Sequence, residues 1–463
     1  MLGLYPTWFE PGVGSGWVIA LIATIHVLFS HASVGSALLF AWLVRRAVTH
    51  NRPEYFTFIR RYGLFLLIFS YVLGSVTGPG IWFSATIANP RGLSALIHNF
   101  VWLWATEWVF FLIEIVGVYL LVYLAGRVAQ ETYLRLTTIF ALSSVSTLLV
   151  ITGVLSFMLA PGSQSWFETG SVMQAFFGPN TLAQVFVRLF FMLTITGVVG
   201  GIVAAGITDM AEKASVTRAL SVVGAFGTIA GAACFWWYMQ TLPALSDLII
   251  TTRIPDHFVT MMAAATIGSL AYFAVMAAAP SLMKASIAAV ATVAILVVGL
   301  APEEMAREII RKPWVAGQFI YSNQLIGRDV PGLGLKSEMP KVAEKGILAQ
   351  HPFVPENLRT VTDENRVEAG RALALTMCSG CHSLTPTGMR PLKNFFAADA
   401  KKTDIAEYLG AGLYRGHTMY MPPLPLPALE RDALAAYIEA SITAADPAAL
   451  ASKGAAALKG ETK

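Results

Sequence analysis

Residues 17–44 read WVIALIATIHVLFSHASVGSALLFAWLV, and this stretch contains no Asp, Glu, Lys or Arg. Roughly 20 apolar residues are enough for a helix to cross the hydrocarbon core of a bilayer, so the stretch predicts a membrane span. Its only ionisable side chains are His26 and His31. Of the 463 residues in the chain, 56% are hydrophobic and only 13% are charged. A soluble globular protein carries about 25% charged residues, so that class is excluded.

Seven further apolar stretches follow along the chain. The eight expected spans are residues 17–44, 62–85, 96–123, 137–159, 183–207, 219–242, 257–278 and 281–300. The last is expected to continue as a helix to about Pro313. Because lipid offers the backbone no hydrogen bonds, each span should be a helix. The sequence therefore predicts an all-α fold, in which a polytopic bundle of about eight membrane helices comes first.

The basic residues of the short loops indicate how this bundle is oriented. The first, third, fifth and seventh loops hold ten Lys and Arg residues, whereas the second, fourth and sixth hold only Arg91 and Arg253. Basic loops stay in the cytoplasm, so we expect the N-terminus outside. With eight spans, the C-terminal part also lies outside. The chain is thus expected in the inner membrane of a bacterium, with both termini on the periplasmic side.

The composition changes after the last span. We expect a membrane bundle over residues 1–325, a linker rich in Pro, Gly and Lys over 326–362, a small α-helical domain over 363–445 and a flexible tail over 446–463. A polar helix should lead into Cys378, and an amphipathic helix over residues 428–441 should end the domain. The chain has only three cysteines, and one of them, Cys234, lies in an apolar run. A disulfide scaffold is therefore excluded.

Residues 378–382 read CSGCH, which matches the CxxCH motif for covalent attachment of a c-type haem. Two thiols bond the vinyl groups of the haem, and the adjacent histidine reaches the iron from one face. A redox or zinc site is the alternative, but zinc wants two further Cys or His ligands, and only His417 is near. We therefore predict one covalent haem c on Cys378 and Cys381, with His382 as an iron ligand. Attachment of haem c occurs outside the cytoplasm, in agreement with the loop charges.

A second iron ligand is expected downstream, where residues 419–423 read MYMPP. This segment resembles the Met-Pro-Pro ligand loop of class I cytochromes c, and the resemblance favours Met421. Met419 is the next candidate, and His417 is interpreted as a surface histidine. Methionine ligation raises the reduction potential of a haem, which suits a carrier that passes electrons to a strong oxidant.

Ionisable side chains inside the spans are costly in a bilayer and are functional candidates by default. Glu107 and Glu114 are seven residues apart and thus close to the same face of one helix. The other candidates are, in chain order, His26, His31, Arg188, Glu304 and Arg307. His31 is also compatible with a hydrogen-bonded core residue, and the charges at the end of the last span are compatible with an interfacial cap.

Four of these segments together resemble subunit I of the cytochrome bd oxidases. They are, in order, HVLF at residues 26–29 with Gly35, GSVTG at 74–78, the stretch 104–117 with its two glutamates, and EIIRKPW at 308–314. The resemblance covers approximately residues 10–320, although the two glutamates are one residue closer together than in that family. It implies one or two membrane haems of b and/or d type, with His26 and Glu308 as iron ligands and Arg311 beside haem propionates. It further implies that Glu107 and Glu114 serve as an opposing ligand or as proton carriers.

The departures from that family concern electron entry from quinol. Arg188 stands where the family's low-spin b haem has its histidine, and a protonated guanidinium cannot ligate iron. The methionine partner survives as Met262 or Met261, and His257 is a candidate substitute for the lost ligand. Alternatively, Arg188 neutralises a propionate or another buried carboxylate. The long hydrophilic loop that oxidises quinol in the family is also missing, because residues 242–256 are too few to replace it.

The combined pattern predicts a membrane haem oxidoreductase. An external donor protein, such as a soluble cytochrome, would reduce the haem at Cys378, and electrons would pass to the haems of the bundle and on to O2. The alternative is an electron-transfer subunit without oxygen chemistry, which links a periplasmic redox partner to a membrane complex or the quinone pool. A haem-based gas sensor is a third class, but the sequence shows no cytoplasmic signalling domain. The expected partners are lipid and a second membrane subunit or a second copy of the chain, and no nucleic acid.

Overall fold

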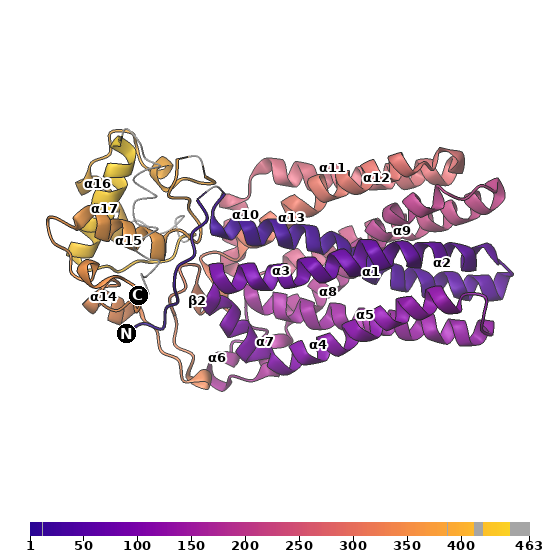
Figure 1. Ribbon diagram of the computed structural model, residues 1–463, viewed down its shortest axis with the longest axis horizontal. Coiled ribbons are helices and arrows are strands. Elements are labelled where there is room, and N and C mark those ends of the chain that lie inside the picture. The colour runs from indigo at the N-terminus through magenta and orange to yellow at the C-terminus, as the bar shows by residue number, and fades with distance from the viewer. Residues whose placement is uncertain (12, 387, 412–419, 445–463) are drawn as a thin grey trace, which may run out of the picture.

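The computed structural model describes residues 1–11, 13–386, 388–411 and 420–444. Figure 1 shows a long bundle of helices with a smaller domain packed against one of its ends, which we call the docked end. Eight described helices are long and apolar enough to cross a membrane: Ser15–His50 (α1), Glu54–Ala88 (α2 to α3), Pro90–Leu124 (α4), Gln130–Leu159 (α5), Pro179–Ala204 (α8), Met210–Gln240 (α9), Asp256–Ala278 (α11) and Ala285–Ile310 (α12 to α13). The predicted all-α fold with about eight spans is confirmed.

Two of these spans contain a π-helical turn. One runs as α2 (Glu54–Leu66), η1 (Leu67–Val72) and α3 (Leu73–Ala88), and the other as α12 (Ala285–Ala294), η3 (Ile295–Leu300) and α13 (Ala301–Ile310). Single π turns inside α-helices are frequent at functional sites. Both turns here lead into helices that carry candidate site residues, since α3 holds the GSVTG segment and α13 holds Glu308.

Small residues let the central helices of the bundle touch. A Cβ atom at Gly35 of α1 would lie 2.3 Å from the carbonyl oxygen of Met192 in α8, and one at Gly227 of α9 would lie 2.5 Å from that of Phe190. In lipid, such close backbone packing holds helices together. The centre of the bundle is α8, because 72% of its most apolar stretch is buried, against 17% for α4 and for α11. The two outer helices therefore turn most of their surface to lipid or to a partner.

Short elements close the docked end of the bundle. They are α6 (Trp166–Thr169), α7 (Val172–Phe176), α10 (Ala244–Arg253) and the antiparallel strands β1 (Trp314–Ala316) and β2 (Ile320–Tyr321). At the opposite end, η2 (Pro280–Leu282) joins α11 to α12. Phe157 of α5, Trp166 of α6 and Phe319, between the two strands, form an aromatic cluster. The ring centroid of Trp166 lies 4.9 Å from that of Phe157 and 5.5 Å from that of Phe319.

The C-terminal domain is also helical. Its elements are η4 (Pro331–Leu333), α14 (Met339–Lys345), η5 (Glu356–Leu358), α15 (Arg366–Met377), η6 (Leu392–Phe395), α16 (Lys402–Ala411) and α17 (Ala428–Thr443). A Cβ atom at Gly370 of α15 would lie 1.9 Å from the carbonyl oxygen of Ala433 in α17, so glycine is required where these two helices cross. Both helices predicted for this domain, the one before Cys378 and the one over residues 428–441, are present.

The segment 326–362, predicted as a linker, contributes to the core of the C-terminal domain. Val342, Ile347 and Leu348 are fully buried there. The Glu430 carboxylate of α17 accepts hydrogen bonds from the backbone N–H groups of Ile347 at 2.7 Å and Leu348 at 2.9 Å. Apolar residues do not recur at helix or strand spacing in the short turns of this segment, and for this reason the sequence predicted a linker. A buried carboxylate supplies hydrogen bonds that regular secondary structure would otherwise provide.

The first residues of the chain also belong to the C-terminal domain. Leu2 and Leu4 are buried in its core, and the backbone N–H of Leu2 donates to the Gln350 carbonyl oxygen at 3.0 Å. Figure 1 shows the N-terminus beside this domain, before the chain enters α1. The expected boundary at residue 325 therefore does not separate two cores, because residues 2 and 4 pack in the core of the C-terminal domain.

We expect Glu430→Ala to lower the free energy of unfolding of the C-terminal domain by about 2–4 kcal/mol, because it leaves two buried N–H groups without an acceptor. Burial raises the pKa of Glu430, and the two N–H donors oppose that effect. Urea titration of the full chain in detergent, with proteolysis of the C-terminal domain as the readout, measures the change. Glu407→Ala on the exposed face of α16 is the control and should change the free energy by less than about 0.5 kcal/mol. Equal effects of the two substitutions would contradict the role given to Glu430.

Candidate functional site

The CxxCH residues lie on one turn at the end of α15. The N–H of Cys378 donates to the Ala374 carbonyl oxygen, and that of His382 to the Cys378 carbonyl oxygen, both at 2.9 Å. The turn thus carries two thiols and an imidazole, the donor set that haem c attachment needs. In the part of the chain that the structure describes, no group of three or more His, Cys, Asp or Glu side chains is placed to hold a metal ion. The zinc alternative therefore has no support there.

His382 is oriented by a backbone carbonyl. Its Nδ1 lies 3.2 Å from the carbonyl oxygen of Arg390, which can only accept, so Nδ1 carries the proton and Nε2 is free. Metal-ligating histidines commonly make this contact. The ring packs nearly at right angles to Phe395, with centroids 4.7 Å apart. Burial, together with the charge of Arg390, lowers the pKa of His382 to about 4. The imidazole is therefore neutral at pH 7, as a metal ligand must be.

The predicted second iron ligand lies beside the same arginine. The ring of Tyr420, next to Met421, is 5.8 Å from the guanidinium carbons of both Arg390 and Arg253 of α10. Met421 itself is half-buried. Outside the described residues lie the two alternatives, Met419 and His417. The choice of Met421 stays a prediction.

The CxxCH turn packs directly against the membrane bundle. A Cβ atom at Gly16, in the first turn of α1, would lie 2.8 Å from the Gly380 carbonyl oxygen. Arg311 and Lys312, just after α13, are close enough for their charges to act on Cys381. The candidate haem c site therefore lies at the docked end, in contact with α1, which carries His26, and within electrostatic range of the residues that follow α13.

In the bundle, His26 of α1 faces the glycine-rich segment of α3. Its Nδ1 lies 2.9 Å from the Thr77 hydroxyl, which donates its proton to the Leu73 carbonyl oxygen at 2.9 Å. In the tautomer with its proton on Nδ1, His26 donates to this hydroxyl and Nε2 keeps its lone pair for a ligand. A Cβ atom at Gly78 would lie 3.4 Å from His26 Cε1, so the glycine leaves room for the ring. The free Nε2 fits the predicted role of iron ligand.

The two glutamates of α4 have different surroundings. Glu114 is 2% exposed, and its Oε1 accepts a hydrogen bond from the Thr147 hydroxyl of α5 at 2.5 Å. Glu107 is half-buried and makes no hydrogen bond or ion pair with any residue that the structure describes. Its neighbour Trp108 is 63% exposed. A carboxylate near lipid is costly without a partner, so Glu107 needs a cofactor, a proton or a second protein beside it.

Arg188 of α8 is bound by a carboxylate. Its Nη2 lies 3.4 Å from Glu304 Oε1, and Arg307 binds the other oxygen of the same carboxylate. Arg188 and Glu304 are 8% and 7% exposed. Of the interpretations considered for Arg188, neutralisation of a buried carboxylate is the one that this geometry supports. Glu304 therefore belongs to a buried cluster of charged side chains, and the interpretation as an interfacial cap stays a prediction.

Two further histidines were candidates. His31 of α1 is 4% exposed, lies within electrostatic range of Arg188 and Glu304, and has no hydrogen-bond partner for Nδ1 among the described residues. The backbone of Val27, one turn earlier in α1, is the hydrogen-bonding group within reach of this ring, so the interpretation as a core histidine stays open. His257 is exposed at the start of α11, where its ring lies 4.7 Å from that of Phe258.

Glu308 is held by two cations. Arg311 binds one carboxylate oxygen, and Lys312 Nζ lies 2.6 Å from the other. Arg311 Nη1 also lies 3.6 Å from Met158 Sδ, while its Nε has no hydrogen-bond partner in the described part of the chain. The structure thus brings together the predicted pair Glu308 and Arg311 and adds Lys312. Each carboxylate oxygen has a second lone pair, so Glu308 can keep both cations in its predicted role as an iron ligand.

A pocket of about 450 Å³ opens at the docked end, between the end of α5, the start of α8 and the connection from α9 to α10. Its lining includes Ser156, Asn180, Thr241 and Trp314. The Asn180 amide donates to the Thr241 hydroxyl at 3.1 Å. The volume and the mixed polar and apolar lining are those of a small-molecule site.

Solved structures supply one informative comparison. The chain matches the structure titled "The structure of bd oxidase from Geobacillus thermodenitrificans" with a TM-score of 0.53 and 16% sequence identity, over 71% of this chain and 92% of that one. The bundle has a bd oxidase-like fold. At this identity the match shows the fold alone. No protein-family model and no curated protein sequence matches the chain.

The groups that orient the candidate ligands were missing from the sequence-based prediction. Thr77 stood in the GSVTG segment without a role, and Arg390 and Lys312 had none. Thr77 is 51 residues from His26 along the chain, and no spacing rule joins positions so far apart. The one available signal was a hydroxyl inside a segment that already resembled the bd family.

We expect Thr77→Val to weaken haem binding in the bundle about 10- to 100-fold, the usual cost of removing an outer hydrogen-bond partner of a metal-ligating histidine. Valine keeps the size of the side chain and removes the hydroxyl that orients His26. Thr86→Val on the same helix is the control, because the Thr86 hydroxyl donates only to Trp82 of its own helix, at 2.7 Å. Haem titration of the purified proteins, followed by pyridine haemochrome spectra, measures the effect. Equal haem content in all three proteins would show that Thr77 does not position His26.

Proposed function

We propose that this chain is a membrane-bound haem oxidoreductase with two kinds of haem site. Electrons from an external donor enter at a covalent haem c on Cys378 and Cys381 and continue to haems of the bd oxidase-like bundle, where O2 is reduced. The observation that carries this proposal is the contact between the CxxCH turn and the first membrane helix, at Gly380 and Gly16. Because the entry site touches the bundle, no separate carrier is needed between them.

The residues of the C-terminal domain fit their proposed roles. Cys378 and Cys381 would form the two thioether bonds to the haem, and His382, through Nε2, and Met421 would ligate its iron. A bound haem c supplies a one-electron couple whose potential methionine ligation raises. The Arg390 carbonyl oxygen fixes the tautomer and the ring orientation of His382. His382 is 8% exposed, so the protein shields this ligand from water.

The proposed ligands of the bundle are His26 and Glu308. His26 offers Nε2, since Nδ1 is engaged by Thr77. Glu308 offers a carboxylate that Arg311 and Lys312 hold at the docked end. Arg311, whose Nε has no hydrogen-bond partner among the described residues, would then bind a haem propionate.

Proton supply is the proposed role of the α4 glutamates. Oxygen reduction consumes protons, and a carboxyl group inside the bundle can hold and release them. Glu114 is buried and bound to Thr147, which suits a proton carrier. Glu107, without a partner among the described residues, suits either the opposing iron ligand or a second carrier.

Electron entry through the C-terminal domain agrees with two departures from the bd oxidases. Arg188 is already bound by Glu304 and cannot ligate iron. The connection from α9 to α11 consists of α10 (Ala244–Arg253) and short turns, with no room for a long quinol-oxidising loop. Both departures remove quinol-linked parts and leave the haem c as the point of entry.

The location that fits is the bacterial inner membrane, with the docked end facing the periplasm. The basic loops lie at the opposite end of the bundle, as cytoplasmic loops do, and haem c is attached outside the cytoplasm. The donor is then a periplasmic protein such as a soluble cytochrome. A second membrane subunit or a second copy of the chain would cover the exposed face of α4 around Glu107 and Trp108.

Spectra of the purified protein test this proposal. Reduction with dithionite should give a c-type α band together with b- or d-type bands. Carbon monoxide should shift the latter bands, because a haem that reduces O2 keeps an open coordination position, and a reduced artificial donor should support O2 uptake. The Cys378→Ala, Cys381→Ala double variant, as control, should lose the c-type band alone. A c-type band without others would contradict the membrane haems, and the absence of both a CO shift and O2 uptake would contradict the oxidase.

One observation favours a second candidate, an electron-transfer subunit that connects a periplasmic donor to the quinone pool. The pocket at Asn180 and Thr241 has the size and the polar lining that a quinone headgroup needs. Anaerobic oxidation of the haem c by a soluble quinone, together with an absent CO shift, would select this candidate over the oxidase.

A further inference from the structure

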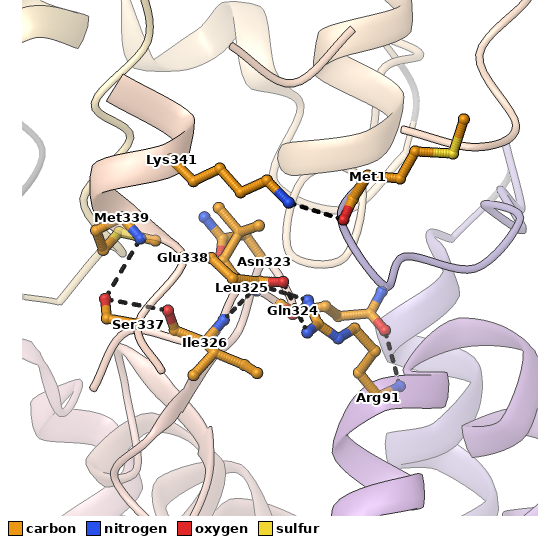
Figure 2. Close-up of polar contacts among 10 residues, drawn as sticks. All are labelled: Met1, Arg91, Asn323, Gln324, Leu325, Ile326, Ser337, Glu338, Met339 and Lys341. Carbon is orange, nitrogen blue, oxygen red and sulfur yellow. Dashed lines mark hydrogen bonds and ion pairs between the residues drawn. The ribbon is translucent and has the colours of Figure 1, made fainter. Parts of the chain in front are cut away.

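Arg91, at the start of α4, is the centre of a contact between the bundle and the C-terminal domain (Figure 2). Its Nη1 donates to Glu338 Oε2 at 2.8 Å and its Nη2 to Glu338 Oε1 at 3.1 Å. Nη1 also donates to the Gln324 carbonyl oxygen at 2.7 Å, and the Arg91 backbone N–H donates to Gln324 Oε1 at 3.2 Å. The two charged side chains are 11% and 13% exposed. A two-pronged pair of this kind, largely out of water, fixes both distance and angle.

Glu338 carries this contact into the C-terminal domain. Its Oε2 accepts from the Ile326 N–H at 2.9 Å, and its own N–H donates to the Ile326 carbonyl oxygen at 2.8 Å. Glu338 directly precedes α14, whose Val342 is fully buried in the core of the domain. A displacement of α14 would therefore break the contacts between Arg91 and Glu338. Loss of these contacts would, in turn, release the start of α14 from the bundle.

The N-terminal segment makes a second connection. Leu2 and Leu4 are buried in the C-terminal core, and Lys341 Nζ donates to the Met1 carbonyl oxygen at 2.9 Å. Further along, the Thr385 hydroxyl, three residues after His382, donates to the Pro11 carbonyl oxygen at 2.6 Å. The chain then enters α1, so this segment ties the core of the domain to the first membrane helix.

The CxxCH turn meets the bundle close to both connections, because Gly380 shares the lining of one small pocket with Trp8 of the N-terminal segment and with Gln324. A Cβ atom at Gly16 would lie 2.8 Å from the Gly380 carbonyl oxygen, so α1 has no space for a side chain at this position. A domain that swings on a tether needs a flexible polar linker, whereas residues 326–362 pack into the domain core. The contacts are those of a domain held in one position.

We propose that the Arg91–Glu338 pair and the N-terminal segment clamp the C-terminal domain onto the docked end, and that Arg91 is a positioning residue for electron entry. Electrons then pass from the haem c site into the bundle without movement of the domain. Only this electron step rests on the proposed function; the clamp itself does not. Electron transfer slows steeply with distance, so a loosened clamp should slow the transfer and leave the haem c itself unchanged.

Three substitutions in the full chain, purified in detergent, test the clamp. Arg91→Ala removes the pair, and Glu338→Gln keeps the size of the side chain and removes its charge. Arg135→Ala is the matched control, because Arg135 pairs with Glu131 on the exposed surface, where both side chains are about 75% exposed. The measurements are amide hydrogen exchange in residues 326–345, the rate of electron passage from haem c to the bundle, and the midpoint potential of haem c.

We expect both clamp variants to raise the exchange rate in residues 326–345 at least tenfold and to slow electron passage at least tenfold, with the haem c potential and the control unchanged. Unchanged exchange in both variants would overturn the clamp, even if the rate fell. Increased exchange with an unchanged rate would overturn the positioning role of Arg91. If the unsubstituted chain passes no electrons from haem c to the bundle, the proposed function fails, and the exchange rates still decide whether the clamp exists.

Discussion

Inside a bilayer, a polar side chain persists only where a partner replaces water, and this constraint determines how the bundle is built around its site. Arg188 of α8 pairs with the Glu304 carboxylate of α13, and His26 of α1 contacts the Thr77 hydroxyl of α3. The first pairing neutralises the charge of Arg188, and the second engages Nδ1 of His26, so that Nε2 is the nitrogen left for a ligand. Glu107 has no such partner among the described residues, so a proton, a cofactor or a second protein has to offset the cost of its charge near lipid.

The C-terminal domain is also joined to the bundle by side chains that need a partner once they are out of water. Its core takes in Leu2 from the far end of the chain, and Arg91 of the bundle reaches Glu338 beside that core. Close to these two connections, the CxxCH turn meets α1 at a contact that only glycine allows. The proposed site for electron entry thus lies where the C-terminal domain closes the bundle, and that bundle has the bd oxidase-like fold.

The sequence predicted what depends on local pattern. Span lengths follow from hydropathy, and the CxxCH turn follows from five consecutive residues, so both were available before the structure. Contacts between distant segments were not. Arg91 entered only as a charge that indicates orientation, because its partner Glu338 is 247 residues away. The segment 326–362 resembled a linker because its apolar residues do not recur at helix or strand spacing. Two of its buried N–H groups donate to the Glu430 side chain, and no local sequence pattern predicts a contact between segments so far apart. The ligand roles of His26 and Glu308 came from a family resemblance and stay predictions.

The order in which the haems are reduced tests the central claim most directly. After rapid anaerobic mixing with a reduced one-electron donor, we predict that the c-type α band develops first and that the bundle bands follow. The second step should have a first-order rate that does not depend on protein concentration, because both sites belong to one clamped chain. Bundle bands that develop before the c-type band, or at a rate that grows with protein concentration, would contradict electron entry through the Cys378 site.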